Sequence, residues 1–331
     1  MTTLYATMAD TLFVVRDAES DAPTLETRFG GHEFECVAAH PRVPSRVFVG
    51  TFEGGLYRSL DRTETFERVG SETFGSDAVM AVAIDPSDPD IVWAGTEPSA
   101  VYRSTDGGQT WTSRPGLTDL PSADEWYFPP RPHTHHVRWL EPDPRDADRL
   151  YVGIEAGALV RTDDGGQTWH DRPDGARLDN HSLATHPDAP GRVYAAAGDG
   201  YAESADGGET WTHPQSGLDH RYCWSVAVAS NDPDAVVLSS ASGPRAAHSP
   251  PEAISYVYRR TADGWVQSMD GLPGPEGLAR AELAVDASGV FYALSNRGVH
   301  RSTDDGRSWS APDVEWPDAF VSQTPSGLAV V

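Results

Sequence analysis

Histidine, arginine and aromatic residues gather in two short segments of this 331-residue sequence. Residues 131–138 read Arg-Pro-His-Thr-His-His-Val-Arg and hold three of the 12 histidines, and residues 220–224 read His-Arg-Tyr-Cys-Trp. Arginine forks bind carboxylates, aromatic faces stack on sugar rings, and imidazoles ligate metals or carry protons. These residue types suit a small anionic or polyhydroxyl ligand, or a metal ion, if the fold brings the two segments together.

Both segments belong to a sequence that repeats itself, and the repeat must position them. Residues 104–111 read Ser-Thr-Asp-Gly-Gly-Gln-Thr-Trp. Near copies stand at 162–169, 204–211 and 302–309, with a shortened copy at 261–265 and a decayed copy at 59–66. The shared aspartates recur at intervals of about 40 to 60 residues, as in radial repeat proteins. They are Asp61, Asp106, Asp164, Asp206, Asp263 and Asp304.

Each period contains four runs that are typical of β-strands. In the second complete repeat the first three runs are 79–84, 91–95 and 100–103, and the fourth starts at Trp111. Four short strands in a period of this length predict one blade of an antiparallel propeller, and seven pairs of second and third strands predict seven blades. We therefore predict an all-β, seven-bladed β-propeller that occupies residues 1–331 as a single domain.

The two ends of the chain match different strands of one blade. Residues 327–331, Gly-Leu-Ala-Val-Val, match the first strand of a repeat, whereas residues 4–6, Leu-Tyr-Ala, match the second. Pairing of these N- and C-terminal strands completes one shared blade and hides two sheet edges. We therefore expect a closed ring.

The repeated segment resembles the Asp-box (BNR) repeat, Ser/Thr-x-Asp-x-Gly-x-Thr/Ser-Trp, of sialidases, sortilin-like receptors, some glucanases and a photosystem II assembly factor. In that family the boxes lie between the third and fourth strands of a blade, away from the ligand face, so the resemblance implies that the six shared aspartates are structural. The residue types agree, because Ser, Thr and Asp side chains bond the turn backbone and glycine supplies positive φ. Calcium is the alternative, but each box offers too few oxygens for its ligand shell.

Strand direction alternates within a blade, so the turns between second and third strands share one face with the connections between blades. The two longest periods carry insertions at 116–132 and 242–253, and both fall on this face. On the first strand of successive blades, the position of Met80 is held by Glu35, Met80, Arg138, His181, Trp224 and Ala281, a row that we expect to face a ligand or water. The candidate ligand-binding residues of this mouth are Arg131, His133, His135, His136, Arg138, Glu155, His181, Arg221, Tyr222, Trp224, Arg245, His248, Asn296 and Arg297.

Three functions fit such a mouth. In the first, it binds or hydrolyses a small anionic or sugar-type ligand, with Glu155, His133 or His135 as general acid or base and with Arg131 and Arg138 stabilising charge. In the second, His133 and His135 point to one side of an extended chain and ligate a divalent metal ion. Their remaining partners are His181 or His248. A divalent metal is the only cofactor that the sequence pattern indicates. In the third, the propeller is a platform for protein partners without catalysis.

The sialidase branch of the resemblance is limited. Sialidases use an arginine triad, a Tyr/Glu nucleophile pair and an aspartic acid, with an early Arg-Ile-Pro signature. The nearest run in this chain is Pro-Arg-Pro at 130–132, in the third repeat and without the isoleucine. The resemblance thus implies glycosyl-hydrolase-like character rather than sialidase activity. Residues that match by type alone are Arg138, Arg221 and Arg245 for the triad, and Tyr222 with Glu155 for the nucleophile pair.

The charge of the chain excludes several classes of function. There are 50 acidic and 25 basic residues, the latter all arginine, and the formal net charge is −25. Such a charge repels phosphate backbones, so we expect no nucleic-acid partner. No apolar run approaches the ~20 residues that span a bilayer, and no signal-like segment opens the chain, so we expect a cytoplasmic protein without membrane contact. The acid-rich, lysine-free composition resembles that of halophilic proteins, whose self-repulsion is screened by molar salt.

Overall fold

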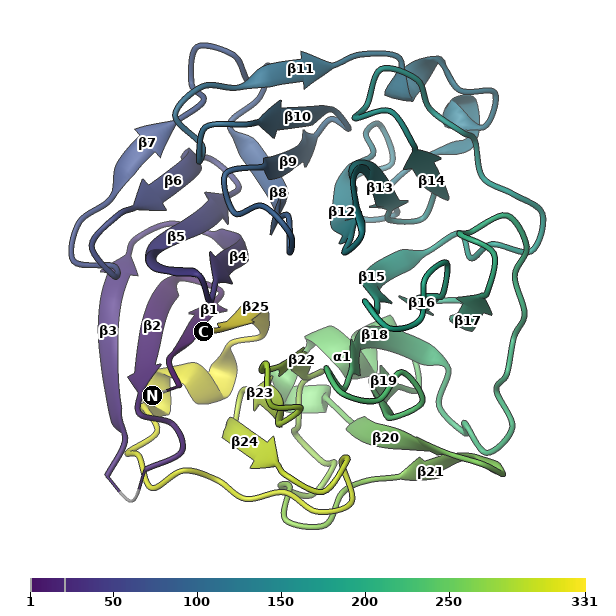
Figure 1. The fold of residues 1–331 in the computed structure, drawn as a ribbon. Coiled ribbons are helices and arrows are strands. Elements are labelled where there is room, and N and C mark those ends of the chain that lie inside the picture. The colour runs from purple at the N-terminus through teal and green to yellow at the C-terminus, as the bar shows by residue number, and fades with distance from the viewer. Residues whose placement is uncertain (1, 21) are drawn as a thin grey trace.

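The computed structural model describes residues 2–20 and 22–331 and shows seven antiparallel sheets arranged in a ring (Figure 1). All 25 strands in these residues belong to the ring, which confirms the predicted seven-bladed propeller. The first strand of each blade is innermost (Figure 1), and five of these strands line a central channel. No helix in the described part of the chain is long and apolar enough to cross a bilayer.

Four blades have four strands and three blades have three. Written from the inner strand outward, the blade that joins the two ends of the chain comprises β25 (Pro325–Val330), β1 (Leu4–Met8), β2 (Thr11–Arg16) and β3 (Thr24–Gly30). The next two four-stranded blades are β4 (Phe34–His40), β5 (Val43–Thr51), β6 (Gly55–Ser59) and β7 (Glu67–Val69), and then β8 (Ala78–Ile84), β9 (Val92–Glu97), β10 (Val101–Ser104) and β11 (Thr112–Arg114). The last comprises β18 (Tyr222–Val228), β19 (Val236–Ala241), β20 (Ser255–Thr261) and β21 (Gly264–Gln267). The three-stranded blades are β12 (Val137–Asp143), β13 (Asp146–Ile154) and β14 (Ala158–Thr162); β15 (Asn180–Thr185), β16 (Val193–Ala197) and β17 (Gly200–Ser204); and β22 (Glu282–Val285), β23 (Phe291–Ser295) and β24 (Gly298–Ser302). Short helical elements occupy some connections: α1 (Pro244–His248) and 3-10 turns at Leu117–Asp119, Ala123–Glu125, Pro250–Glu252 and Asp318–Ser322.

In each three-stranded blade the fourth strand is reduced to a single bridge. Between Glu203 and Thr212, for example, one bridge forms, and Pro214 follows two residues later. Proline has no N–H to donate to a sheet ladder, so the strand cannot continue.

The ring is closed by the two ends of the chain, as predicted. Strand β25 pairs antiparallel with β1, with Leu4 opposite Val330 and Ala6 opposite Leu328. The N and C termini therefore lie beside each other in the ring (Figure 1). This pairing places β1 between β25 and β2, and all of its residues are buried.

The boxes lie between the third and fourth strands, and their aspartates serve the turn itself. Asp106 shows the pattern: its Oδ1 accepts hydrogen bonds from the Ser104 hydroxyl at 2.8 Å and the Thr110 N–H at 2.9 Å, and its Oδ2 accepts one from the Thr110 hydroxyl at 2.6 Å. Gly108 has φ +80°, and a Cβ there would lie 2.5 Å from the Phe48 ring of the preceding blade. Asp61, Asp164, Asp206 and Asp304 repeat these side-chain bonds.

Asp263 departs from the structural role that we expected for it. Its shortened copy lacks the residues that would follow the turn, and Thr261 instead pairs directly with Gly264 across a tight hairpin between β20 and β21. The Asp263 side chain is exposed there. The deletion converts a box into a two-residue turn, so the aspartate has no loop backbone to hold.

The residues that occupy the Met80 position on the first strands lie at β-bulges. In five blades the pairing between the first and second strands skips one residue of the first strand. Such a bulge leaves a residue unpaired and redirects its side chain. The five skipped residues are Glu35, Met80, Arg138, His181 and Trp224.

The hydrophobic core lies between neighbouring blades. Trp93 of β9 is fully buried and packs in one cluster with Leu140 and Val152 of the next blade. Cys36 and Cys223 are buried free thiols, so no disulfide contributes to the ring. Because each blade buries one sheet face against the next, the packed strands hold the ends of the mouth connections in fixed positions.

Candidate functional site

A pocket of about 520 Å³ opens where the two insertions meet. The first insertion contributes Phe128, Pro129 and Pro130 to its wall, and the second contributes residues from Pro244 to Ser249. The other lining residues come from separate blades: Glu155 from the β13–β14 turn, Asp179 from the connection before β15, and Tyr222 from the start of β18. The pocket thus draws on the connections of one face only, the face opposite the boxes.

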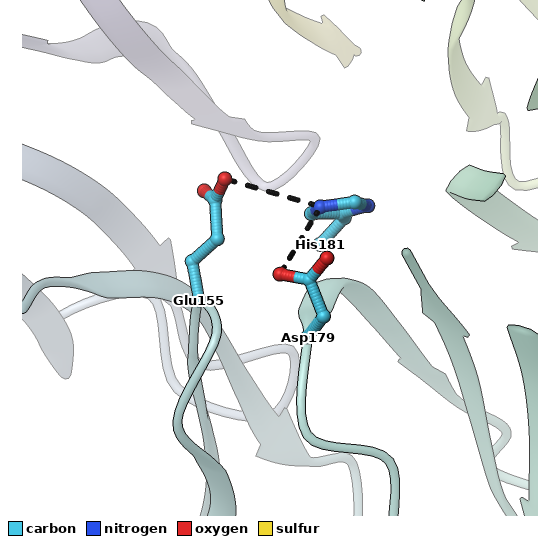
Figure 2. Close-up of side chains that lie close together, drawn as sticks. All are labelled: Glu155, Asp179 and His181. Carbon is cyan, nitrogen blue, oxygen red and sulfur yellow. Dashed lines mark ion pairs between the residues drawn. The ribbon is translucent and has the colours of Figure 1, made fainter. Parts of the chain in front are cut away.

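Two carboxylates and one imidazole converge at the inner end of this pocket. His181 Nε2 lies 3.6 Å from Asp179 Oδ1 and 3.9 Å from Glu155 Oε1. Figure 2 shows both carboxyl groups turned toward the same imidazole nitrogen. The His181 side chain has no exposed surface, whereas 12% of the Glu155 side chain and 29% of the Asp179 side chain are exposed. The carboxylates therefore meet the pocket and the histidine lies behind them.

Each member of this group is held in place by a further hydrogen bond. His181 Nδ1 lies 2.7 Å from the Cys223 carbonyl oxygen, which can only accept, so Nδ1 carries the proton and the other nitrogen faces the carboxylates. His136 Nε2 bonds the second oxygen of Glu155 at 3.0 Å. The Ala156 N–H donates to Asp179 Oδ1 at 3.0 Å.

A chain of hydrogen bonds leads from Arg280 through His248 of the second insertion to Tyr222, which lies beside His181. The Arg280 Nε–H donates to His248 Nδ1 at 3.2 Å, which places the remaining histidine proton on Nε2. That N–H faces the Tyr222 hydroxyl oxygen at 3.1 Å, so the tyrosine proton is free to point elsewhere. His181 Nε2 lies 3.5 Å from the same hydroxyl. The Tyr222 proton can therefore be donated either to His181 Nε2 or to a ligand in the pocket that Tyr222 lines.

Trp224 is buried behind the site and does not line the pocket. It is 3% exposed, and the guanidinium groups of Arg280 and Arg138 lie over its ring, 3.5 Å and 4.7 Å from the centroid. Its indole N–H donates to Glu282 at 2.7 Å, and its ring contacts both His181 and His248. The indole thus fixes the two imidazoles, whereas we expected it to contact ligand.

Most arginines of the mouth are already paired with carboxylates. Arg131 donates to Glu97 at 2.7 Å, and Arg245 donates to Glu252 at 2.8 Å. Arg280 donates to Glu282 at 2.6 Å in a pair buried on both sides. Arg138 lies 3.7 Å from Glu155 and is buried. The mouth is therefore less cationic than its arginine content indicates.

The environment moves the pKa values of the pocket groups in different directions. Burial alone would raise the pKa of Glu155, but the His136 hydrogen bond and the nearby His136, His181 and Arg138 hold it well below its usual range. Burial raises the pKa of Asp179, against the effect of His181. Burial and the Arg280 charge lower the pKa of His248 to about 2, so this imidazole is neutral, as the hydrogen-bond chain requires.

Several candidate residues do not join this group. We expected His133 and His135 to lie on an extended chain, but the Phe128 N–H donates to the Thr134 carbonyl and the Thr134 N–H donates to the Arg131 carbonyl, which folds the segment into a compact loop. The loop leaves His133 exposed and turns His135 onto Trp126. His133 and His135 therefore do not join His181 and His248 as the predicted metal set requires, and His136 of the same segment contacts Glu155.

Three candidates at other turns have different surroundings. Arg221 is exposed and lines a neighbouring hollow with Asp199 and Tyr222. Asn296 is buried, and its amide bonds the backbone of Ala279, Gly277 and Val321, which is a structural role. Arg297 is exposed and packs beside Gly277.

Sequence reasoning missed Asp179, Arg280 and Glu97 as members or supports of the site. Asp179 stands two residues before His181, and that spacing was the one available signal. Arg280 and Glu97 lie in positions that vary among repeats without a motif. Only the packing of separate blades brings them to the pocket.

Comparison with known proteins supports the repeat and the fold. The BNR/Asp-box repeat family matches residues 102–113. A glycoside hydrolase of family GH74 from Niastella koreensis is 18% identical over 93% of this chain and 51% of its own, with a TM-score of 0.69. The GH74 xyloglucanase from Xanthomonas campestris is 17% identical over 94% of this chain and 52% of its own, with a TM-score of 0.66. This chain spans about half the length of these enzymes or less.

A second group of similar structures matches nearly end to end. YCF48 from Cyanidioschyzon merolae is 16% identical over 88% of this chain and 87% of its own, with a TM-score of 0.58. A YCF48 structure bound to D1 peptide is 15% identical over 85% of this chain and 82% of its own, also with a TM-score of 0.58. At these identities the likeness concerns the fold alone. A search of the curated proteins finds no match to this sequence.

Proposed function

Because this chain is a β-propeller built on Asp-box repeats, we propose that it binds a small carbohydrate-type ligand in the pocket where its two insertions meet. The composition of the pocket wall carries the proposal: the carboxylates of Glu155 and Asp179, the hydroxyl of Tyr222 and the ring of Phe128. Carboxylates and a phenol bond sugar hydroxyls, and an aromatic ring packs on the C–H face of a sugar.

The charge around the pocket favours a neutral ligand over an anionic one. Arg131 is bound to Glu97, and Arg245 is bound to Glu252. The carboxylates that reach the pocket, Glu155 and Asp179, would repel an anion at short range. The residues of the mouth indicated an anionic or a sugar-type ligand from the sequence. Of these two, we propose the sugar-type ligand.

The similar GH74 structures make carbohydrates the first class of compound to test. For any hydrolysis of the bound ligand, we propose Asp179 rather than Glu155 as the acid–base group, because both carboxyl groups line the pocket but burial raises the pKa of Asp179. Glu155 has a lowered pKa and is oriented by His136, so it stays ionised and would stabilise positive charge. His133 and His135 have no part in this proposal, since neither lines the pocket.

A protein partner is the second candidate, and one feature favours it. Large apolar side chains are exposed beside the pocket residues: Tyr127 at 50%, Leu178 at 46% and Ile254 at 39%. All three lie on the connections of the mouth face. Exposed apolar groups of this kind mark surfaces for association. A similar YCF48 structure holds a D1 peptide, which makes an extended peptide the class to test.

Calorimetric titration with neutral oligosaccharides, uronic acids and organic acids tests the first candidate. We expect a neutral sugar to bind, and Tyr222→Phe to weaken it by about fivefold, the worth of one hydrogen bond of about 1 kcal/mol. Arg297→Ala is the control, because it changes an exposed group of the same face that does not line the pocket.

The other outcomes decide between the candidates. Binding of uronic acids alone, abolished by Arg245→Ala, would show that the pocket selects anions. If no sugar binds and an extended peptide binds in a manner lost with Leu178→Asp, the protein-partner proposal replaces the first.

A further inference from the structure

We infer that Glu155, Asp179 and His181 form a binding site for one divalent transition-metal ion, of the Zn²⁺ or Mn²⁺ type. The inference does not depend on the carbohydrate proposal, because an ion would bind these side chains with or without a sugar. It also differs from the histidine set predicted from sequence, since it takes one imidazole and two carboxylates from two adjacent blades.

The spacing of the three groups is that of ligands around an ion rather than of hydrogen-bond partners. One atom from each side chain can be chosen so that all lie within 4.8 Å of one another. His181 Nε2 is 3.6 Å from Asp179 and 3.9 Å from Glu155, beyond a good hydrogen bond. Two ligands that each lie about 2.0 to 2.2 Å from a metal are separated by roughly 3 to 4 Å.

The buried histidine is presented as a ligand. Its Nδ1–H is donated to the Cys223 carbonyl at 2.7 Å, which in the neutral ring places the Nε2 lone pair on the side of the carboxylates. Nε2 has one long hydrogen-bond contact, to the Tyr222 hydroxyl at 3.5 Å, which a bound ion would replace. A metal-bound histidine normally donates its second N–H to a carbonyl or carboxylate in this way. A fully buried ring aimed between two carboxylates is therefore an independent sign of a ligand.

The carboxylates are supported in the same manner. His136 binds the outer oxygen of Glu155 at 3.0 Å, which leaves Oε1 toward His181. Asp179 is held by the Ala156 N–H, and a Cβ on Gly198 would lie 1.9 Å from Asp179 Oδ2. The glycine thus makes room for the carboxylate. The pocket beside Glu155 and Asp179 supplies space for water or a ligand hydroxyl at the remaining coordination positions.

The donor set selects the class of ion. One nitrogen and two carboxylate oxygens suit Zn²⁺, Mn²⁺ and related ions, whereas Ca²⁺ and Mg²⁺ prefer oxygen alone. The buried thiol of Cys223 bonds Ser240 and the Arg221 carbonyl and is not among the grouped ligands, so a soft thiolate site is not formed. The carboxylates of the five complete Asp-boxes are not alternative metal ligands, because their oxygens accept hydrogen bonds from their own turns.

Titration of tag-free, EDTA-treated protein with Co²⁺ and Zn²⁺ in 1 M KCl tests the inference. The salt screens the net charge of −25 and suppresses diffuse binding to the acidic surface. We expect one equivalent of Co²⁺ with visible ligand-field absorption, displaced by one equivalent of Zn²⁺. Glu155→Gln and Asp179→Asn should each weaken binding at least tenfold while the near-ultraviolet circular dichroism of the protein stays unchanged.

Matched variants separate the site from its surroundings. Glu252→Gln and His133→Ala change a carboxylate and a histidine of the same face outside the trio, and should leave Co²⁺ binding unchanged. Gly198→Ala should weaken binding by displacing Asp179, whereas Gly243→Ala should not, because a Cβ there meets nothing within 4 Å. Absence of stoichiometric Co²⁺ binding, or binding that survives both Glu155→Gln and Asp179→Asn, would overturn the inference. Because no sugar is present, neither result bears on the carbohydrate proposal.

Discussion

The two faces of this propeller use carboxylates in opposite ways. On the box face, Asp106 takes its hydrogen bonds from residues at most four positions away, and the turn is complete in itself. On the mouth face, Glu155 meets His136 and His181, and His181 in turn bonds Cys223 from the next blade. A carboxylate saturated by its own loop stabilises that loop, whereas one left partly open between blades is available for chemistry.

Removing one member of the buried Arg280–Glu282 pair should have the largest effect. Arg280→Ala leaves Glu282 buried without its guanidinium, and we expect a loss of about 3 to 5 kcal/mol in the free energy of unfolding. His248 also loses its donor. Urea unfolding measures the change. Arg245→Ala, which breaks an exposed pair on the same face, should change the stability far less. Equal losses in the two variants would contradict the contrast between buried and exposed pairs.

The box face offers a comparison within a single motif. Asp106→Ala removes the acceptor of the turn and should cost about 1 kcal/mol, as loss of a capping side chain does. Asp263→Ala should leave the free energy of unfolding unchanged, because the shortened copy forms a hairpin without a box. Thermal unfolding of both variants, beside the parent chain, makes the comparison. A destabilised Asp263→Ala would mean that the aspartate serves its turn after all.

The pH dependence of stability should differ in sign between the boxes and the channel wall. Burial is the largest single effect on Asp106 and would raise its pKa, but hydrogen bonds from Thr110 and Ser104 together lower that pKa to about 2. The unfolded value is about 4, so this contribution is present above pH 4 and is lost as the pH falls from 4 toward 2. Burial raises the pKa of Glu141 on β12 to about 7, so its ionisation destabilises the fold as the pH rises from about 4 to 7.

Urea unfolding between pH 2 and pH 8 measures both limbs. Asp106→Asn should flatten the acid limb slightly, because several other boxes remain. Glu141→Gln should flatten the limb between pH 4 and 7, since the amide does not titrate. Its single oxygen can accept from the Thr185 N–H and hydroxyl, while the bond that the Trp139 N–H gives to the other oxygen is lost at every pH. An unchanged upper limb in Glu141→Gln would place the titrating group elsewhere.

The parts of this fold that depend on neighbours in sequence were predictable. The box pattern predicted the turns, the order of short runs predicted four strands per blade, and the mismatched ends predicted the seam between β1 and β25. Comparison of repeats also singled out Arg138, His181 and Trp224, although the bulges that redirect them have no sequence signature that we could use. The prediction that failed was the extended conformation at His133 and His135. These residues lie at an insertion, which has no counterpart in the other repeats with which it could be aligned.

The sequence by itself determined the number of blades, their closure and the structural use of five box aspartates, because each depends on contacts within a repeat or on pairing of its complementary ends. Only the tertiary structure decided the membership of the mouth. The compact loop after Phe128 excluded His133 and admitted His136, and the meeting of adjacent blades added Asp179 to His181. The physical reason is that a binding pocket is made of side chains distant in sequence, and their convergence is set by packing between blades rather than by any pattern within one.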